Sequence, residues 1–219
     1  MSQIPYVTFI IPSIGRKTLA NTIAHLTDLT LPNWKAIVVF DDVAPTITET
    51  ERIKPIVTST KLGKGINNAA EVRNFGIKHA LTDTYLTPAW FAFVDDDDVL
   101  VPNYISNLLT ESMRHGWDNL DVVAFSMVYT DGTIRPKDTR KPIEEQENDI
   151  GISFACRSWV FTGNNKAKLN PIWFDPSTGE DYQFLMKAKR NGYNIKISNW
   201  INYEVSPLGV AEDRKVNCE

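Results

Sequence analysis

The sequence predicts an α/β fold with a mostly parallel central sheet, and three observations carry this prediction. Apolar segments at 6–11, 36–40 and 90–94 are rich in β-branched and aromatic residues without alternation, which is typical of strands buried on both faces. Segments with apolar residues at helical spacing separate them. Each of these strands also runs into a polar or acidic stretch, and open α/β sheets bind their ligands at the carboxyl ends of the strands.

The first half of the chain alternates strands and helices in the order of a doubly wound sheet. Pro12 ends the first strand, and the apolar residues after Lys17 then recur at helical spacing. A loop at 61–65 carries two lysines and two glycines. In chain order we expect a strand at 6–11, a helix at 17–28, strands at 36–40 and 53–57, a helix at 67–81, a strand at 90–94 and a helix at 102–114.

The second half has a different pattern. Asp131-Gly132 separates an apolar segment at 122–129 from Ile134, which predicts a β-hairpin. The charged segment 137–149 predicts a mobile surface loop, of a length that often forms a lid. The further expected elements are a short helix or strand at 153–160, a helix that begins near Glu180 and stops at Asn191-Gly192, late strands at 194–197 and 200–205, and a frayed tail from Ala211.

The bulk properties narrow the class of protein. A chain of 219 residues fits a single domain, 1–219. Lys and Arg number 23 against 27 Asp and Glu, and this net charge of −4 argues against a nucleic-acid partner. No apolar run approaches the ~20 residues of a transmembrane helix, and the first residues lack the features of a signal peptide. Two cysteines make neither a disulfide framework nor a zinc cluster, so we expect a cytosolic protein.

The most unusual stretch is the run of four carboxylates from Asp95 to Asp98, directly after an apolar strand. Adjacent carboxylates repel one another, and a bound cation is the usual reason to tolerate them. Aspartate oxygens suit Mg²⁺ or Mn²⁺. The alternative is a solvated turn that places negative charge at the start of the next helix, and for Asp98 alone the two interpretations are equally good.

Three more stretches at strand ends carry polar groups: Pro12 to Arg16, Asp41-Asp42, and the loop before Arg73. Each alone is weak, since Asp41 could cap a turn and Arg73 could cover the sheet with its stem. The glycines at 63 and 65 match neither the Walker loop nor the dinucleotide pattern. Together these stretches predict a nucleotide-diphosphate site, with carboxylates for a ribose and a metal and cations for the phosphates.

Glu180 and Asp181 form a second acidic site at the start of a predicted helix. Such a pair can simply complement the helix dipole, but a projecting carboxylate can also act as a general base. No histidine is arranged with a serine or cysteine as in a hydrolase. Nearby aromatic residues could stack on a sugar, although core packing is the favoured interpretation for them: Trp159, Phe161, Trp173 and Tyr182.

These residues in combination resemble the GT-A glycosyltransferases, most closely those of family 2. The resemblance covers residues 6 to about 200. The matching stretches are Pro12-Ser13-Ile14-Gly15-Arg16, Asp41, Arg73-Asn74-Phe75-Gly76-Ile77, Phe93-Val94-Asp95-Asp96-Asp97-Asp98 and Gly179-Glu180-Asp181, with Arg190-Asn191-Gly192-Tyr193 at the end of the following helix.

The resemblance implies a GT-A fold with a nucleotide-binding half at about 1–100 and an acceptor-binding half at about 101–210. It implies transfer of a sugar, with inversion, from a nucleotide-sugar (UDP by default) to a glycan or glycoconjugate, with Mn²⁺ or Mg²⁺. It places Asp181 as the base, with Glu180 as neighbour or substitute. Asp95 and Asp97 would be the metal pair, Asp97 the direct ligand, with the register uncertain by one residue. The donor-side residues would be Pro12, Ser13, Arg16, Asp41, Asp42, Arg73, Asp95 and Asp96.

Two departures from the family pattern qualify these expectations. The membrane segments of processive members are absent, so a chain-extruding synthase is not expected. The chain is short for the family, which suggests a minimal catalytic domain or part of a larger polypeptide. Three alternatives stay open at this point: a sugar nucleotidyltransferase, a non-catalytic nucleotide- or sugar-binding module, and an acidic Ca²⁺-binding surface.

Overall fold

A computed structural model describes residues 7–63, 69–82, 89–163 and 169–206. Its first half is a parallel sheet in the order β3-β2-β1-β4. The segments expected as strands form it, and β1, β2 and β4 are buried on both faces because helices cover the sheet, whereas the edge strand β3 is mostly half-buried. The bounds are β1 Val7–Ser13, β2 Trp34–Phe40, β3 Ile53–Val57 and β4 Trp90–Phe93.

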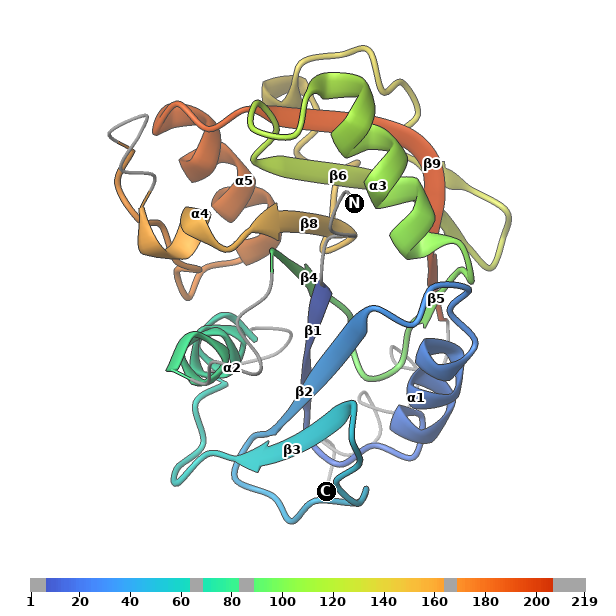
Figure 1. Ribbon diagram of the computed structural model, residues 1–219, viewed down its shortest axis with the longest axis vertical. Helices are drawn as coiled ribbons and strands as arrows, with labels where there is room; N and C mark the ends of the chain where they lie inside the picture. Colours follow the sequence, from blue (N-terminus) through green and yellow to red (C-terminus); the bar gives the residue numbers. More distant parts are fainter. Residues whose placement is uncertain (1–6, 64–68, 83–88, 164–168, 207–219) are drawn as a thin grey trace.

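The sheet continues into the second half without a break. After β4 the order is β8-β6-β9-β5, and a short strand β7 pairs with β6. β8 is antiparallel to both β4 and β6, whereas β9 runs parallel to β6 and curves around one end of the molecule (Figure 1). The bounds are β5 Val99–Leu100, β6 Val122–Tyr129, β7 Ile134–Arg135, β8 Phe154–Arg157 and β9 Ile195–Val205. The predicted α/β fold with a mostly parallel central sheet is confirmed.

Helices flank this sheet on both sides, as a doubly wound arrangement requires. Figure 1 shows α2 and α1 on opposite sides of β1 and β2. No described helix is long and apolar enough to cross a membrane. The bounds are α1 Leu19–Thr27, α2 Ala70–Thr82, α3 Tyr104–His115, α4 Trp159–Thr162 and α5 Glu180–Arg190.

Gly76 is the point at which α2 comes closest to the sheet. A Cβ atom there would lie 2.8 Å from Val39 Cγ2 and 2.9 Å from Ile10 Cγ2. Both neighbours are fully buried and belong to β2 and β1. The helix therefore lies against the sheet only because this residue has no side chain, which accounts for the glycine of the Arg-Asn-Phe-Gly stretch.

Gly76→Ala is expected to lower the free energy of unfolding by about 1–3 kcal/mol, the usual cost of overpacking a core. The better helix propensity of alanine, up to about 1 kcal/mol, offsets part of this cost. Denaturant unfolding at equilibrium measures the difference. Lys78→Ala, on the exposed face of the same helix, is the control, and equal stability of the two variants would contradict the packing argument.

Three elements differ from the sequence-based expectation. The late strands are one strand, β9, whose pairing with β6 shifts register between Ala124 and Met127. The two-residue strand β5 had no signal because so short an element shows no periodicity. The charged segment 137–149 is not a loop throughout: it holds a 3-10 turn at Ile143–Glu145, anchored by the buried side chains of Ile143 and Gln146.

Four expectations concern residues outside the described part of the chain. They are the start of the first strand at Tyr6, the loop residues Lys64 and Gly65, the start of the second helix at Asn67, and the tail from Ala211.

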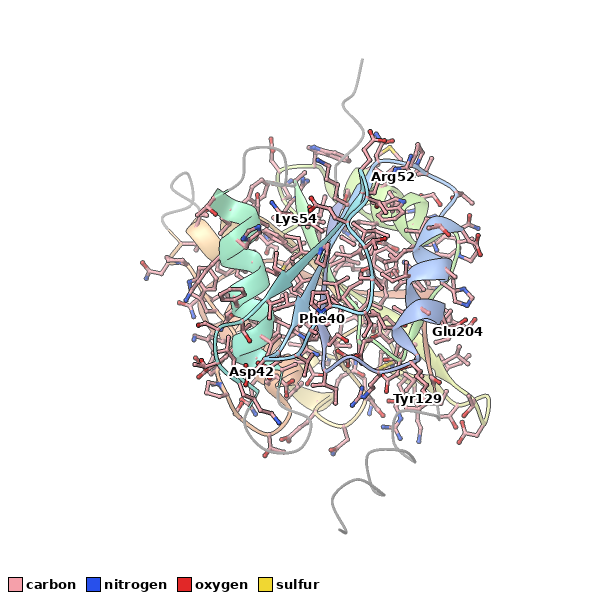
Figure 2. All side chains as sticks on the ribbon, turned by 90° about the horizontal axis from the view of Figure 1, so that it is seen from below. Phe40, Asp42, Arg52, Lys54, Tyr129 and Glu204 are labelled. Atoms are coloured by element: carbon pink, nitrogen blue, oxygen red, sulfur yellow. The ribbon has the colours of Figure 1, made fainter. Side chains whose placement is uncertain are left out.

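The carboxyl ends of the parallel strands meet at one edge of the sheet. Ser13 at the end of β1 is in register with Phe40 at the end of β2, and Ile10 is in register with Phe93 of β4. Figure 2 shows Asp42, just after β2, at the same lower edge as Tyr129, the last residue of β6. Arg52, before β3, lies at the opposite edge.

Candidate active site

The four aspartates leave β4 in a tight turn, closed by a hydrogen bond from the Asp98 N–H to the Asp95 carbonyl at 3.2 Å. Their exposure alternates. Asp96 and Asp98 are buried, whereas Asp95 and Asp97 are half-buried and keep part of their surface accessible. The two accessible carboxylates are thus separated by one residue.

The stretch after β1 contacts this turn directly. Ser13 Oγ donates to Asp96 Oδ2 at 2.6 Å and also accepts the Gly15 N–H. Arg16 Nη1 donates to Asp96 Oδ1 at 2.8 Å and to Asp97 Oδ2 at 3.2 Å. The structure therefore brings together two stretches that the sequence analysis assigned to one site. Pro12 lies within β1, half-buried beside Val39 of β2.

Residues that the sequence analysis missed hold the far side of the turn. The buried Tyr203 hydroxyl, on β9, accepts the Asp95 N–H at 3.0 Å and also bonds the Asp98 side chain. Asp98 Oδ1 accepts the Ser206 N–H at 2.8 Å, and the Thr22 hydroxyl of α1 donates to the Asp98 carbonyl. A single tyrosine in a late strand carries no sequence signal for this role, because the long-range pairing of β9 with β5, which sets Tyr203 opposite Leu100, brings it to the turn.

Burial and crowding raise the pKa of three of the four carboxylates, Asp96, Asp97 and Asp98. Burial, together with the negative charge of Asp95, raises the pKa of Asp97 to about 6 and that of Asp98 to about 8. Burial also raises the pKa of Asp96, against the bond from Ser13 and the charge of Arg16. Arg16 and Ser13 thus only partly compensate the repulsion, as expected of carboxylates that gain stability from a further cation.

Arg73 on α2 is buried and joins two parts of the site. Its Nη2 lies 2.6 Å from Asp95 Oδ1, and its Nη1 lies 2.8 Å from Glu180 Oε1. Burial disfavours the charged guanidinium, but the two carboxylates outweigh burial and raise the pKa of Arg73. Glu180 is therefore a buried, paired carboxylate.

Asp181, the next residue, is placed differently. Its side chain is half-buried, and the partner that the described residues supply for it is the N–H of Tyr182, at 2.8 Å from Oδ1. A Cβ built on Gly151 would lie 3.3 Å from Asp181 Oδ2 and 3.0 Å from Met127 Cε, so the missing side chain at 151 leaves room for this carboxylate. Burial raises its pKa, while the Tyr182 N–H and the Arg73 charge oppose that rise.

Asp41 and Asp42 form a separate group at the end of β2. Asp41 is buried, and its carboxylate accepts the N–H groups of Leu62 at 2.6 Å and Gly63 at 2.9 Å. It therefore holds the loop that leads toward α2. Asp42 is exposed and has a left-handed backbone with φ 58°, a conformation that aspartate tolerates better than most residues.

The model of the family described as glycosyl transferase family 2 matches residues 8–173, three quarters of the chain. The chain belongs to glycosyl transferase family 2. No curated protein sequence matches it.

Solved structures of similar fold include those of TarS 1-349 and of the mannosyltransferase PcManGT. TarS 1-349 of S. aureus superposes with a TM-score of 0.70 at 18% identity, covering 96% of this chain and 64% of TarS 1-349. The mannosyltransferase PcManGT from Pyrobaculum calidifontis, in complex with GDP-Man and Mn²⁺, gives a TM-score of 0.63 at 13% identity, covering 93% of this chain and 57% of that one. This chain thus spans less than two thirds of either neighbour.

The residues of this family 2 chain fit a metal that a substrate helps to hold. Within the described ranges no group of three or more His, Cys, Asp or Glu side chains is arranged to cage a metal ion. Mg²⁺ and Mn²⁺ sites in proteins commonly use one or two carboxylates, with substrate phosphates and water as the other ligands. Asp95 and Asp97, the two accessible carboxylates of the crowded turn, match that pattern.

The aromatic residues near the site are mostly core. Phe161 packs on Trp173 and on Phe184, and the Tyr182 hydroxyl donates to the Glu144 carbonyl. Trp159 instead stacks with Arg157 and donates to Asp121 at 2.7 Å, so it belongs to a different cluster. All of these contacts lie within the protein, in agreement with the favoured interpretation that these residues are structural.

Tyr129 and Arg135 are further residues that the sequence analysis did not select. The Arg135 guanidinium lies 4.8 Å from the centre of the Tyr129 ring. Burial raises the pKa of Tyr129, and the negative charges of Asp98 and Asp181 add to the rise while Arg135 opposes it. The hairpin of β6 and β7 therefore contributes to the same edge as the two acidic sites.

Proposed function

We propose that this family 2 protein is a metal-dependent, inverting glycosyltransferase that moves a sugar from a nucleotide-diphosphate sugar to a hydroxyl of a glycan or glycoconjugate. The observation that carries the proposal is that the half-buried Asp95 and Asp97 lie at the same edge of the sheet as the half-buried Asp181, which has no ion-pair partner among the described residues. A donor metal site and a base are the two parts such a transfer needs.

On the donor side, Asp95 and Asp97 would hold the metal, with Asp97 as the direct ligand. Their accessibility supports this register over Asp96 and Asp98, whose carboxylates are buried and bonded within the protein. A bound Mn²⁺ or Mg²⁺ supplies positive charge to the leaving diphosphate. Arg16 lies at the accessible side of the same turn, where it can add a second cation toward the phosphates.

On the acceptor side, Asp181 would remove the proton of the attacking hydroxyl. A general base works best when its pKa lies closer to the working pH than that of an ordinary aspartate, and burial shifts Asp181 in that direction. Displacement by a hydroxyl on the face opposite the leaving group inverts the anomeric carbon. Residues 1–100 would then bind the nucleotide and 101–210 the acceptor.

The nucleobase contacts would come from the end of β2. Asp41 already uses both carboxylate oxygens on the loop at Leu62 and Gly63, so its contribution would be to shape the wall of the base site. Asp42 is exposed, and the described residues supply no partner for its carboxylate, so it is the candidate for a ribose hydroxyl. TarS 1-349 has been solved with UDP-GlcNAc and PcManGT with GDP-Man, and we take UDP as the default base for this chain.

Among the alternatives, a nucleotidyltransferase or a non-catalytic binding module would need no base at Asp181. An acidic Ca²⁺-binding surface would not account for Arg73, which joins Asp95 to Glu180. A cytosolic location stays a prediction.

Thermal unfolding with UDP, GDP, dTDP and CDP, each with and without Mn²⁺, tests the proposal. A ligand at 100 times its Kd adds about 2.7 kcal/mol to the free energy of unfolding, which raises Tm by a few degrees for a chain of this size. We expect a shift that needs both Mn²⁺ and one particular base. A folded protein that shifts with none of the pairs would contradict the donor site.

A further inference from the structure

Two neighbouring residues of α2, Arg73 and Asn74, hydrogen-bond to the segment that leads into α5 and to the proposed base. Arg73 Nη1 binds the Glu180 carboxylate at 2.8 Å, on the first residue of α5. The Asn74 amide makes a reciprocal pair with the Phe174 backbone, donating to its carbonyl at 2.8 Å and accepting its N–H at 3.1 Å. The chain between Phe174 and Glu180 is therefore fastened at both ends to one turn of α2.

The start of α5 depends on this attachment. The N-cap position is Gly179, in a left-handed conformation with φ 67°, and it makes no side-chain capping bond. Ser, Thr, Asp or Asn at this position would normally fix the first turn through its side chain. Glu180 anchors the first residue of α5 to other parts of the chain, because its buried carboxylate binds Arg73 and also accepts the Ala69 N–H at 3.4 Å.

The second terminal nitrogen of Arg73 binds the turn formed by Asp95 to Asp98. Its Nη2 binds Asp95 at 2.6 Å, and its guanidinium lies 5.7 Å from the centre of the Phe174 ring. Its Nε is buried without a hydrogen-bond partner, so the guanidinium donates from its two terminal nitrogens. One rigid group thus sets the distance between the turn at Asp95 and the first residue of α5.

We propose that Arg73 and Glu180 are positioning residues that fix the base, Asp181, relative to the carboxylates of Asp95 and Asp97. This inference rests on the proposed function and assigns Glu180 a role that the sequence left open between substitute base and neighbour. Glu180 is buried and paired, so it holds Asp181 in place through the backbone and does not contact the acceptor. Arg73 likewise acts through Asp95 and Glu180.

Such a role differs from simple stabilisation of the fold. Replacing a whole buried ion pair by apolar residues often changes stability little, whereas removing one partner leaves the other charge buried and uncompensated. In a variant that loses only the charge of Glu180, Arg73 still has Asp95 as an ion-pair partner, which limits that cost. Catalysis, by contrast, is sensitive to a displacement of about 1 Å, which can cost about 10²-fold in rate. The expected signature is therefore a loss of kcat without a matching loss of donor binding.

Glu180→Gln keeps the shape of the side chain and removes its charge. With donor hydrolysis as the assay, we expect kcat to fall by about 10²-fold while KM for the donor and Kd for the nucleoside diphosphate with Mn²⁺ stay unchanged. The control is Lys187→Gln, on the same helix as Glu180. It breaks the exposed ion pair between Lys187 and Asp175, which precedes the helix, and should leave kcat unchanged. An unaltered kcat in Glu180→Gln, or equal losses of kcat and nucleotide affinity, would overturn the proposal.

Arg73→Lys is the second variant, in case the first is poorly folded. A single ammonium keeps the positive charge but cannot span two carboxylates as the planar guanidinium does, so kcat should fall here too. Full activity in Arg73→Lys would overturn the bridging role.

Hydrogen exchange on the ligand-free protein separates this inference from the proposed function. In Glu180→Gln we expect faster exchange in the first turn of α5, at the Gln183 amide, and in the Asp95 to Asp98 turn. If the unaltered protein binds no nucleoside diphosphate, the donor site is wrong, but exchange still decides the coupling. Unchanged exchange at both places would show that the two sites are not coupled.

Discussion

Asp181→Asn is expected to lower the rate of sugar transfer by about 10²- to 10⁴-fold, the usual contribution of a general base. Asparagine has nearly the same shape, and the Oδ1 that accepts the Tyr182 N–H is retained. The fold and the donor site should therefore be intact. Steady-state kinetics give the rate, and thermal unfolding with the nucleoside diphosphate and Mn²⁺ shows that the donor still binds.

The pH dependence adds a second test of the same assignment. Burial raises the pKa of Asp181, so the protonated, inactive form persists to a higher pH than for an ordinary aspartate. At saturating donor and Mn²⁺, kcat should rise with pH through that raised pKa, and this rise should vanish in Asp181→Asn. Asp175→Asn, in the exposed turn before α5, is the matched control. Normal transfer by Asp181→Asn would disprove the role of this residue.

Asp97→Asn is expected to abolish measurable transfer and to remove the Mn²⁺-dependent part of the thermal shift with nucleotide. An amide lacks the charge that a hard cation prefers, and Mg²⁺ or Mn²⁺ would keep few other protein ligands. Calorimetric titration of Mn²⁺ with nucleotide present measures the loss directly.

The variant itself should not unfold. Burial and Asp95 already raise the pKa of Asp97 to about 6, so removing this charge relieves repulsion in the metal-free protein. Asp118→Asn removes an exposed carboxylate elsewhere and serves as the control. If Asp97→Asn bound Mn²⁺ and nucleotide normally, whereas Asp96→Asn did not, the register of the metal pair would be one residue away from the proposal.

Much of the first half could be predicted from the sequence because its signals are local. Unbroken apolar segments show as buried strands, and polar stretches at their carboxyl ends must converge on one edge once the strands are parallel. The contacts of Ser13 and Arg16 with Asp96 and Asp97 agree with that expectation. The second half was predicted less accurately. Two strands were expected where the structure has the single strand β9, and the segment 137–149, expected as a loop, holds a 3-10 turn.

The sequence alone determined which chemical groups the site can use: four clustered carboxylates, a second acidic pair, and arginines between them. The tertiary structure decided how these groups are divided. Arg73 pairs with Glu180, and among the described residues Asp181 has no ion-pair partner. Asp41 bonds to its own loop, while Asp42 is exposed. The long-range pairing of β9 with β5 brings Tyr203 to the turn. Local sequence encodes residue type and period, but pairing between carboxylates and arginines depends on distances that long-range packing sets.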